Sequence, residues 1–441
     1  MFNSLVFYLV IYIGVLFFIS WFVSRKQQDE DFLIAGRNRS GWQILLSKFA
    51  AAIGAGYFIT YTGFAYEYGI GVFAMIIGFI AGFLVFAYWA APRIAAGSRE
   101  GKFYTIGHFV YSKIPNIRAR FLADIFSSAI LFTWLLVGII GSGKIIADFS
   151  LLSYNVAVIV TSLVVLCYLL LAGYRAVILT DVVQSAVIFI LMIMVTWGIV
   201  GTSSFKELHS FSTGSFDVGT AIGFFLFGVL SVFSYSDRYQ LSYAAKDENA
   251  LKHGLGLSVI PILLMAYLLF LVGIFMAGKV PGLDSGLVFT EALKQFLNPS
   301  LVPFAIVLFF AGIMSSADTN IYGISSHYAL AKANNGNYIK TARKAMIGLT
   351  IIVALLAITF PDVVKVSIAG GAVSLLLSFA MMYVIAGGKN FNRFVGSIIG
   401  AVLGLTLGLL YFGLNPVAAI PTLALGAAGL LYKGKKHNFQ K

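Results

Sequence analysis

A short polar stripe follows one of the apolar stretches of this sequence. Ser315, Ser316, Asp318 and Thr319 come directly after the hydrophobic run that ends at Met314. At about 100° per residue in an α-helix, Ser315, Asp318 and Thr319 lie on one face, with Ser316 on its flank. Oxygen ligands of this kind suit Na⁺ and other hard cations. Serine and threonine also bond backbone carbonyls between packed helices, but the carboxylate on the same stripe favours an ion site.

Two further aspartates interrupt apolar stretches. An ionised carboxylate inside a membrane span costs at least about 2.5–3.5 kcal/mol, so such residues usually face a partner or an ion path. Asp181 lies about four residues inside the predicted end of its span, where it could instead pair with Arg175 at the membrane interface. Asp124 is close to a span end and to Arg118 and Arg120, so we expect it to be structural.

A second apolar stretch carries a glycine-rich segment at the depth of the polar stripe. Ile53 and Gly54 lie in a run of small residues, and Ile53 is 11 residues after Trp42. Ser316 is 11 residues before His327, so both positions lie about 16 Å from the same membrane face at the helical rise. Free carbonyls at a helix break and hydroxyls at equal depth are the groups that a dehydrated Na⁺ needs.

Another discontinuity is predicted at the start of the next block of five spans. The apolar run from Gly223 to Ser231 is short and ends in the polar segment 234–237. Glycine-interrupted helices at matching positions of two halves are typical of inverted-repeat secondary transporters, because unwound backbone is tolerated in lipid only where it lines a cavity. Close packing of helices through small residues is the alternative.

The two discontinuities define candidate solute contacts, which are polar, aromatic or small residues near both breaks and on the third core helix. No arginine or lysine is expected at mid-depth, so the sequence favours a small neutral or zwitterionic polar solute. The candidate residues are Gly56, Tyr57, Thr60, Trp134, Ser231, Tyr235 and Ser236.

The composition requires that these residues belong to an all-α polytopic membrane protein. The chain has 441 residues, 60% of them hydrophobic and 11% charged, with a mean hydropathy of +0.93. These values exclude a cytosolic enzyme and a disordered chain, and the single cysteine, Cys167, excludes an intrachain disulfide. The sequence shows no zinc-ligand spacing and no catalytic constellation, so no enzyme and no metal other than Na⁺ is predicted. Apolar runs predict about 13 transmembrane helices, at 5–23, 43–66, 70–92, 121–147, 152–173, 177–200, 219–236, 254–278, 301–326, 345–360, 364–387, 393–412 and 416–432.

The 30 lysine and arginine residues are distributed unevenly among the predicted loops. With the N-terminus outside, five of them lie on the outer side and the remaining 25 on the inner side. Loops rich in lysine and arginine stay in the cytoplasm. We therefore expect an integral protein of the plasma (inner) membrane with an external N-terminus and a cytoplasmic C-terminus. The net charge of +13 then reflects orientation and contact with anionic lipid, not binding of nucleic acid.

Four segments resemble the sequence motifs of the sodium:solute symporter family. They occur in the family's order at residues 31–37, 173–184, 237–247 and 311–318. The resemblance implies a LeuT-like core of five plus five helices in two inverted repeats, with one helix before it and two after. It divides the chain into an N-terminal helix and cytoplasmic loop (1–42), a first repeat (43–203), a second repeat (204–387) and two C-terminal helices with a basic tail (388–441).

The resemblance also implies two cation sites. The principal sodium site would use backbone carbonyls and two hydroxyls, from Ala50, Ile53, Gly312, Ser315 and Ser316. A second sodium or coupling site would use Asp181, Asp318 and Thr319, with Ser315 shared. One departure from the family's motifs is Leu241, which stands where the motif has arginine.

Together these features predict a secondary active transporter. It would carry a small polar organic solute into the cytoplasm by sodium-coupled symport and alternating access, with Na⁺ as the coupling ion and no organic cofactor. The expected partners are the solute, Na⁺ and the lipid bilayer. Na⁺ can drive uptake only if it binds the outward and inward states differently. A transporter-like solute sensor without a transport role is the alternative.

Overall fold

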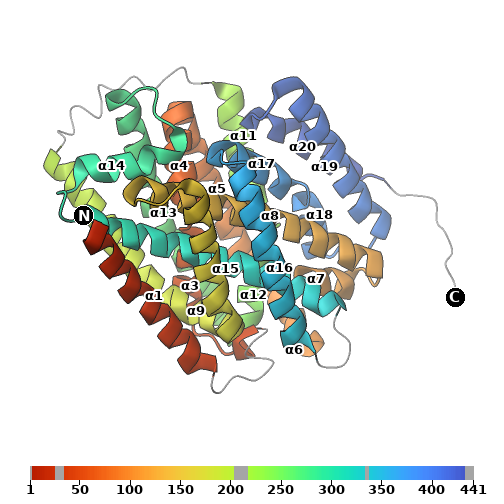
Figure 1. Cartoon of the computed structure of the whole chain (residues 1–441). Helices are drawn as coiled ribbons and strands as arrows, with labels where there is room; N and C mark the ends of the chain where they lie inside the picture. Colours follow the sequence, from red (N-terminus) through yellow and green to blue (C-terminus); the bar gives the residue numbers. More distant parts are fainter. Residues whose placement is uncertain (1, 25–33, 203–216, 333–336, 433–441) are drawn as a thin grey trace.

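Helices make up almost all of the described part of the chain, which comprises residues 2–24, 34–202, 217–332 and 337–432 of this computed structural model (Figure 1). Three predicted features lie outside these residues. They are the start of the first motif (31–33), the boundary between the predicted repeats (203–204) and the basic tail (433–441).

The elements follow one another in two blocks. The first block consists of α1 (Phe2–Ser24), η1 (Ala35–Arg37), α3 (Gly41–Ala52), α4 (Ala55–Tyr68), η2 (Gly69–Val72), α5 (Phe73–Val85), η3 (Phe86–Ala90), α6 (Ala91–Gly101), α7 (Ile106–Lys113), α8 (Ile117–Phe149) and α9 (Tyr154–Thr202). The second block consists of α11 (Val218–Ser231), α12 (Ser236–Ala244), α13 (Glu248–Lys279), η4 (Ser285–Leu287), α14 (Val288–Phe296), α15 (Val302–Lys332), α16 (Tyr338–Thr359), α17 (Val363–Leu375), α18 (Ser378–Ile385), α19 (Phe391–Phe412), η5 (Pro416–Ala418) and α20 (Ala419–Gly429).

Within the described residues, 11 helical stretches are long and apolar enough to cross a membrane. The sequence predicts about 13 spans, and the difference has two sources. The stretch Tyr57–Ser98 forms one continuous candidate, whereas the apolar pattern separates it at the glycines near residue 70. The run 416–432 forms only a shorter apolar helix, Pro416–Gly429. The all-helical membrane fold is confirmed.

The first predicted discontinuity is confirmed between α3 and α4. α3 starts at a capping box in which Ser40 and Gln43 satisfy each other's backbone N–H groups. It ends at Ala52, because Ile53 leaves the helical region and Gly54 is extended (φ −95°, ψ −164°). The helix resumes one residue later as α4, so backbone carbonyls around the break are released from the helical ladder.

The second discontinuity is confirmed between α11 and α12. Asp217 caps the start of α11 by accepting hydrogen bonds from two backbone N–H groups of its first turn. The helix ends at Ser231, and Tyr235 is extended just before α12 begins. Figure 1 shows α3 and α12 in the lower half of the molecule and α4 and α11 near the top. The two broken helices therefore run in opposite directions, as inverted repeats require.

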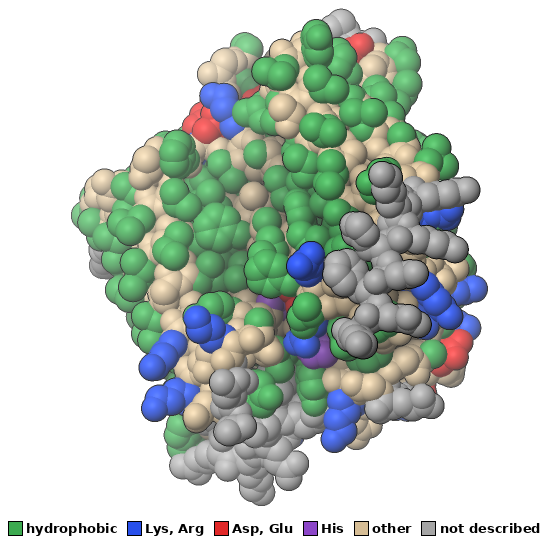
Figure 2. All heavy atoms as spheres, turned by 90° about the vertical axis from the view of Figure 1, so that its right-hand side faces the viewer, with side chains coloured by type: hydrophobic (Ala, Val, Ile, Leu, Met, Phe, Trp, Pro, Cys, Tyr) green, Lys and Arg blue, Asp and Glu red, His purple; other side chains and the backbone are tan. Residues whose placement is uncertain are grey.

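The helix that carries the polar stripe lies at the centre of the packing. In α15, 89% of the most apolar window is buried, and this helix packs against α1, α3, α8, α9 and α16. The outer surface is different. Figure 2 shows hydrophobic side chains across the middle of one face and most of the lysine and arginine side chains in its lower half. The polar stripe is thus shielded from the apolar belt that would face lipid.

A short loop ties the start of α3 to the end of α12. The backbone N–H of Arg39 donates to the carbonyl of Ala244 (2.9 Å), and the N–H of Lys246 donates to the carbonyl of Arg39 (3.0 Å). The turn before this contact has positive φ at Ala35, Gly36 and Arg37. Two main-chain hydrogen bonds therefore connect the start of α3, the first half of one broken helix, to the end of α12, the second half of the other.

A stripe of glycines holds the two C-terminal helices together. A Cβ at Gly400 or Gly404 of α19 would overlap backbone atoms of α20, at Leu425 and Pro421 respectively. This close backbone approach is the packing that the glycine stripe at intervals of four residues favours.

Candidate functional site

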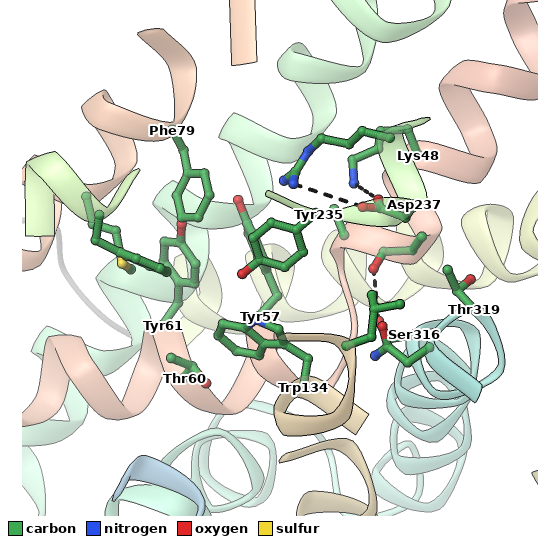
Figure 3. Close-up of a pocket in the computed structure, with 17 residues that line it drawn as sticks. Lys48, Tyr57, Thr60, Tyr61, Phe79, Trp134, Tyr235, Asp237, Ser316 and Thr319 are labelled. Atoms are coloured by element: carbon green, nitrogen blue, oxygen red, sulfur yellow. Dashed lines mark hydrogen bonds and ion pairs between the residues drawn. The ribbon is translucent and has the colours of Figure 1, made fainter. Parts of the chain in front are cut away.

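A cavity of about 120 Å³ lies between the two helix breaks (Figure 3). Four of the candidate solute contacts line it, namely Tyr57, Thr60, Trp134 and Tyr235. The polar stripe of α15 reaches the same cavity through Ser316 and Thr319. The structure therefore places the two candidate sites next to each other.

Aromatic side chains form one wall of the cavity. The rings of Tyr57 and Tyr61 stack at 4.3 Å. Tyr235 hydrogen-bonds with Ser374 through its hydroxyl group (3.1 Å). The hydroxyl of Tyr61 is buried beside that of Tyr57. Tyr61 was not predicted as a solute contact from the sequence. It lies one helical turn after Tyr57 and therefore shares its helix face.

The break between α3 and α4 lies directly against α15. A Cβ at Gly312 would lie 3.1 Å from the carbonyl oxygen of Ile53, and a Cβ at Gly54 would overlap the side chain of Ser316. Ser316 Oγ donates to the carbonyl of Ala51 (3.0 Å). The structure thus brings together Ile53, Gly312 and Ser316, three of the five residues expected at the principal sodium site.

The other two expected residues also lie beside this contact. Ala50 is fully buried in the last turn of α3. Ser315 Oγ donates to Asp181 Oδ1 (2.6 Å), and Ser47 Oγ of α3 donates to Asp181 Oδ2 (2.6 Å). Asp181 is fully buried, and its two carboxylate oxygens accept these hydrogen bonds from α15 and α3.

Asp318 occupies a neighbouring position in the same network. Its Oδ2 accepts a hydrogen bond from the hydroxyl of Tyr168 (2.8 Å), and the hydroxyl of Thr319 donates to the carbonyl of Ser315 (3.0 Å). Hydroxyl groups leave the negative charge of a carboxylate uncompensated, so a monovalent cation or a proton would stabilise each buried acid. The contact of Tyr168 with Asp318 could not be predicted from the sequence, because a lone tyrosine in an apolar run is indistinguishable from a core residue.

Three charged side chains line another part of the cavity, next to Tyr235. Lys48 Nζ of α3 and Asp237 Oδ2 of α12 form an ion pair at 2.5 Å, which Figure 3 shows on one side of the cavity. The guanidinium of Arg238 lies 4.4 Å from the centre of the Tyr235 ring. The prediction that no arginine or lysine reaches the solute region is wrong. Long basic side chains extend to the cavity from both half-helices, and Asp237 offsets part of the cost of burying them.

Ser236 and Ser231 are not among the described residues that line this cavity. Ser236 Oγ lies 2.8 Å from His327 Nε2, and His327 Nδ1 lies 2.9 Å from Ser128 Oγ, so Ser236 takes part in a separate buried network. Ser231 is buried near the end of α11. Gly56 stands in the first turn of α4 and offers only backbone atoms. Asp124 has the structural role that we expected, because it accepts a hydrogen bond from the N–H of Gly107 (2.9 Å).

This fold and this site define a class of protein. An all-helical membrane protein with two oppositely directed broken helices, which meet at a cavity beside buried oxygen ligands, is a broken-helix transporter. The family model described as "Sodium:solute symporter family" matches residues 32–358. The chain therefore belongs to the sodium:solute symporter family.

Two relatives match most of the chain. The sodium/pantothenate symporter of Haemophilus influenzae is 24% identical over 344 residues, which cover 72% of this chain and 70% of that protein. The osmoregulated proline transporter OpuE of Bacillus subtilis is 24% identical over 399 residues, which cover 82% of this chain and 80% of that protein.

Solved structures share the fold at lower identity. A Na⁺-coupled sialic acid symporter in a substrate-bound, outward-open state has a TM-score of 0.77 at 15% identity, covering 97% of both chains. MhsT in complex with L-phenylalanine has a TM-score of 0.57 at 14% identity, covering 89% of this chain and all of that one. These likenesses confirm the LeuT-like fold.

Proposed function

We propose that this protein carries a small polar organic solute into the cytoplasm by sodium-coupled symport. One observation carries the proposal. The break at Ile53–Gly54 lies against Gly312 and Ser316, and this contact adjoins the cavity between the two broken helices. A cation bound there touches the same half-helices that enclose the solute, so occupancy of one site changes the stability of the other.

The principal Na⁺ would take carbonyl oxygens at the helix break and hydroxyl oxygens of α15. The proposed ligands are Ala50, Ile53, Gly312, Ser315 and Ser316. Asp181 supports this site through its hydrogen bond from Ser315. Asp318 and Thr319, together with Asp181, are proposed as a second coupling site, because a further cation or proton would compensate these buried carboxylates.

Alternating access follows from the inverted arrangement of the two repeats, which we place at 43–203 and 204–387. The half-helices α3 and α12 lie in the lower half of the molecule and α4 and α11 near its top (Figure 1), and residues of all four line the cavity. Moving one pair away from the core opens the cavity to one side of the membrane while the other pair keeps it closed. We place α3 and α12 on the cytoplasmic side, since the loops at this end hold most of the lysine and arginine residues.

The names of the relatives support a polar organic solute. One relative is named for pantothenate and another for proline, and a structural neighbour is described as a sialic acid symporter. All three compounds are small organic acids with further polar groups. Tyr57, Thr60, Trp134 and Tyr235 are the proposed solute contacts that the cavity supports.

Counterflow in proteoliposomes tests this proposal. The purified protein is reconstituted and offered labelled candidate solutes, with and without a sodium gradient. We expect at least one solute to be accumulated only when Na⁺ is present. Replacing both Ser315 and Ser316 by alanine should raise the Na⁺ concentration at half-maximal rate strongly, because the hydroxyl ligands are removed.

A matched control keeps the test specific. Ser300 lies on the exposed surface before α15. Its replacement by alanine should leave the sodium dependence unchanged. Uptake of every accepted solute that is unaffected by removing Na⁺ would contradict symport. An unchanged sodium dependence in the double variant would show that the ion site is misplaced.

A further inference from the structure

The charged wall of the solute cavity has more positive than negative groups. Among the described residues that line it, Lys48 and Arg238 are cations, Asp237 is a carboxylate and the others are neutral. The side chains of Lys48, Asp237 and Arg238 are only 4%, 11% and 7% exposed. The cavity therefore has a net charge of +1 in a region with little water.

Asp237 cannot satisfy both cations. One of its oxygens, Oδ2, is 2.5 Å from Lys48 Nζ, whereas the distance from Oδ1 to Arg238 Nη1 is 4.0 Å. Arg238 Nη1 instead donates to the carbonyl of Val232 (3.2 Å), and its guanidinium packs on the ring of Tyr235. The Nε–H of Arg238 and Oδ1 of Asp237 have no hydrogen-bond partner among the described residues. Burying such atoms costs free energy unless a ligand forms hydrogen bonds with them.

The other buried acids nearby do not cancel this charge. Asp181 and Asp318 accept hydrogen bonds from the hydroxyl groups of Ser47, Ser315 and Tyr168, and neither carboxylate lines the cavity. Their negative charge is the charge that the proposed Na⁺ sites would neutralise. Arg238 is thus the cation with the weaker pairing, because its nearest carboxylate oxygen, Oδ1 of Asp237, lies 4.0 Å from Nη1, beyond hydrogen-bond distance.

The aromatic end of the cavity carries further polar groups. The hydroxyl of Tyr61 and the indole Nε1 of Trp134 are buried in this wall, Tyr61 beside the hydroxyl of Tyr57 and Trp134 beside that of Tyr235. Figure 3 shows both residues on the side of the cavity away from Lys48 and Asp237. A molecule that fills the space therefore meets aromatic surface with hydroxyl and indole N–H groups at one end, and positive charge at the other.

We propose that the solute is a small organic monocarboxylate whose carboxylate is bound by Arg238 and Lys48. Its remaining part lies against the aromatic wall and offers oxygen acceptors to Tyr61 and Trp134. A hydroxyl or amide N–H of the solute donates a hydrogen bond to Oδ1 of Asp237. A carboxylate suits the planar fork of arginine and removes the excess charge of the cavity. This proposal rests on the proposed function, since it names the solute class of the same site.

Ligand-induced thermal stabilisation of the purified protein tests the charge requirement. The probes are matched pairs that differ at the carboxyl group: pantothenate against panthenol, L-proline against L-prolinamide, and N-acetylneuraminate against its methyl ester. A wider library of small hydroxy acids and amino acids, each with its primary amide, extends the comparison. We expect stabilisation by at least one carboxylate and an effect of its neutralised partner that is at least tenfold weaker.

Variants assign the effect to the arginine. Arg238→Gln should weaken binding of that carboxylate by about tenfold or more, and Arg238→Lys should retain part of it, because a charge remains at the position. Arg343→Gln removes an exposed cation far from the cavity and should change nothing. If Arg238→Gln does not fold, the Arg238→Lys variant and the matched pairs on the unmodified protein decide the result.

Several outcomes would overturn the proposal. These are the absence of any carboxylate that binds, equal binding of neutral partners, and a carboxylate preference that survives Arg238→Gln. Sodium-dependent counterflow of a neutral solute would overturn it while leaving sodium symport intact. Conversely, carboxylate binding without any sodium dependence of counterflow would support the solute class and contradict the proposed function.

Discussion

A single methyl group at Gly54 should separate the helix break from α15. Gly54 has φ −95° and ψ −164°, which alanine can also adopt, so the substitution does not strain the backbone. Its new Cβ would overlap both Oγ and Cβ of Ser316 and would lie 3.5 Å from the carbonyl oxygen of Gly312. Rotating the Ser316 hydroxyl away relieves only part of this overlap, because Cβ cannot rotate. The two helices must therefore move apart.

The size of the effect follows from this overlap. Inserting a methyl group into a packed contact costs about 1–3 kcal/mol. The proposed Na⁺ needs the carbonyls of Ile53 and Gly312 and the hydroxyl of Ser316 in one shell, so the cost falls on the sodium-bound state. A cost of about 1–3 kcal/mol corresponds to a Na⁺ affinity that is about 5- to 150-fold weaker.

Sodium titration of thermal stability is the assay, with counterflow as a second measure. Gly348→Ala is the matched control, since it is the same substitution at a helical glycine with open space around its Cβ. The double variant Gly54→Ala with Ser316→Gly removes the overlapping side chain. It should regain thermal stability but not sodium affinity, because the hydroxyl ligand is also lost.

Equal sodium affinity in Gly54→Ala and Gly348→Ala would refute the reasoning. It would mean that the break and α15 do not share an ion in any state that the protein visits. A loss of sodium affinity that the double variant fully restores would place the ion elsewhere, since Ser316 would then be dispensable.

Three further predictions concern other contacts. Asp181→Asn should raise the half-saturating Na⁺ concentration about tenfold or more, measured by counterflow, because the carboxylate that holds the hydroxyl ligand loses its charge; an unchanged value would remove Asp181 from the coupling site. Lys48→Met and Asp237→Asn should each lower stability by about 3–5 kcal/mol, and the double variant should lose less than either; additive losses in thermal denaturation would show that the pair does not interact. Gly404→Ala should lower stability by about 1–3 kcal/mol through its overlap with α20 and leave the sodium dependence unchanged; a changed sodium dependence would couple this remote contact to the ion site.

Much of the fold was predictable because a membrane restricts the chain to few solutions. Apolar runs mark helices, and the small residues near Gly54 and the polar run after Ser231 mark both helix breaks. The number of membrane spans was harder to predict from the sequence. Whether a glycine such as Gly69 separates two helices or continues one depends on packing, and the hydropathy of the sequence does not contain that information.

The cluster of polar residues beside the first helix break was also largely predictable, whereas the lining of the cavity was not. Ser315 and Ser316 stand out because polar residues are rare in an apolar helix. The aromatic wall gives no such contrast in a chain with 40 phenylalanines and 22 tyrosines. Lys48 and Arg238 were missed because counting residues from a span end gives the depth of Cα, and a long side chain can reach the cavity from several ångströms away.

The main-chain link between Arg39 and α12 has a mechanical consequence. Two backbone hydrogen bonds and the ion pair between Lys48 and Asp237 connect half-helices that could otherwise hinge independently at their own breaks. Three links in parallel make α3 and α12 a single lever, so this end of the cavity opens by one concerted swing and not by two uncorrelated ones. Their amide hydrogens should accordingly exchange with solvent deuterium as one cooperative unit, slower than either half-helix would if it moved alone.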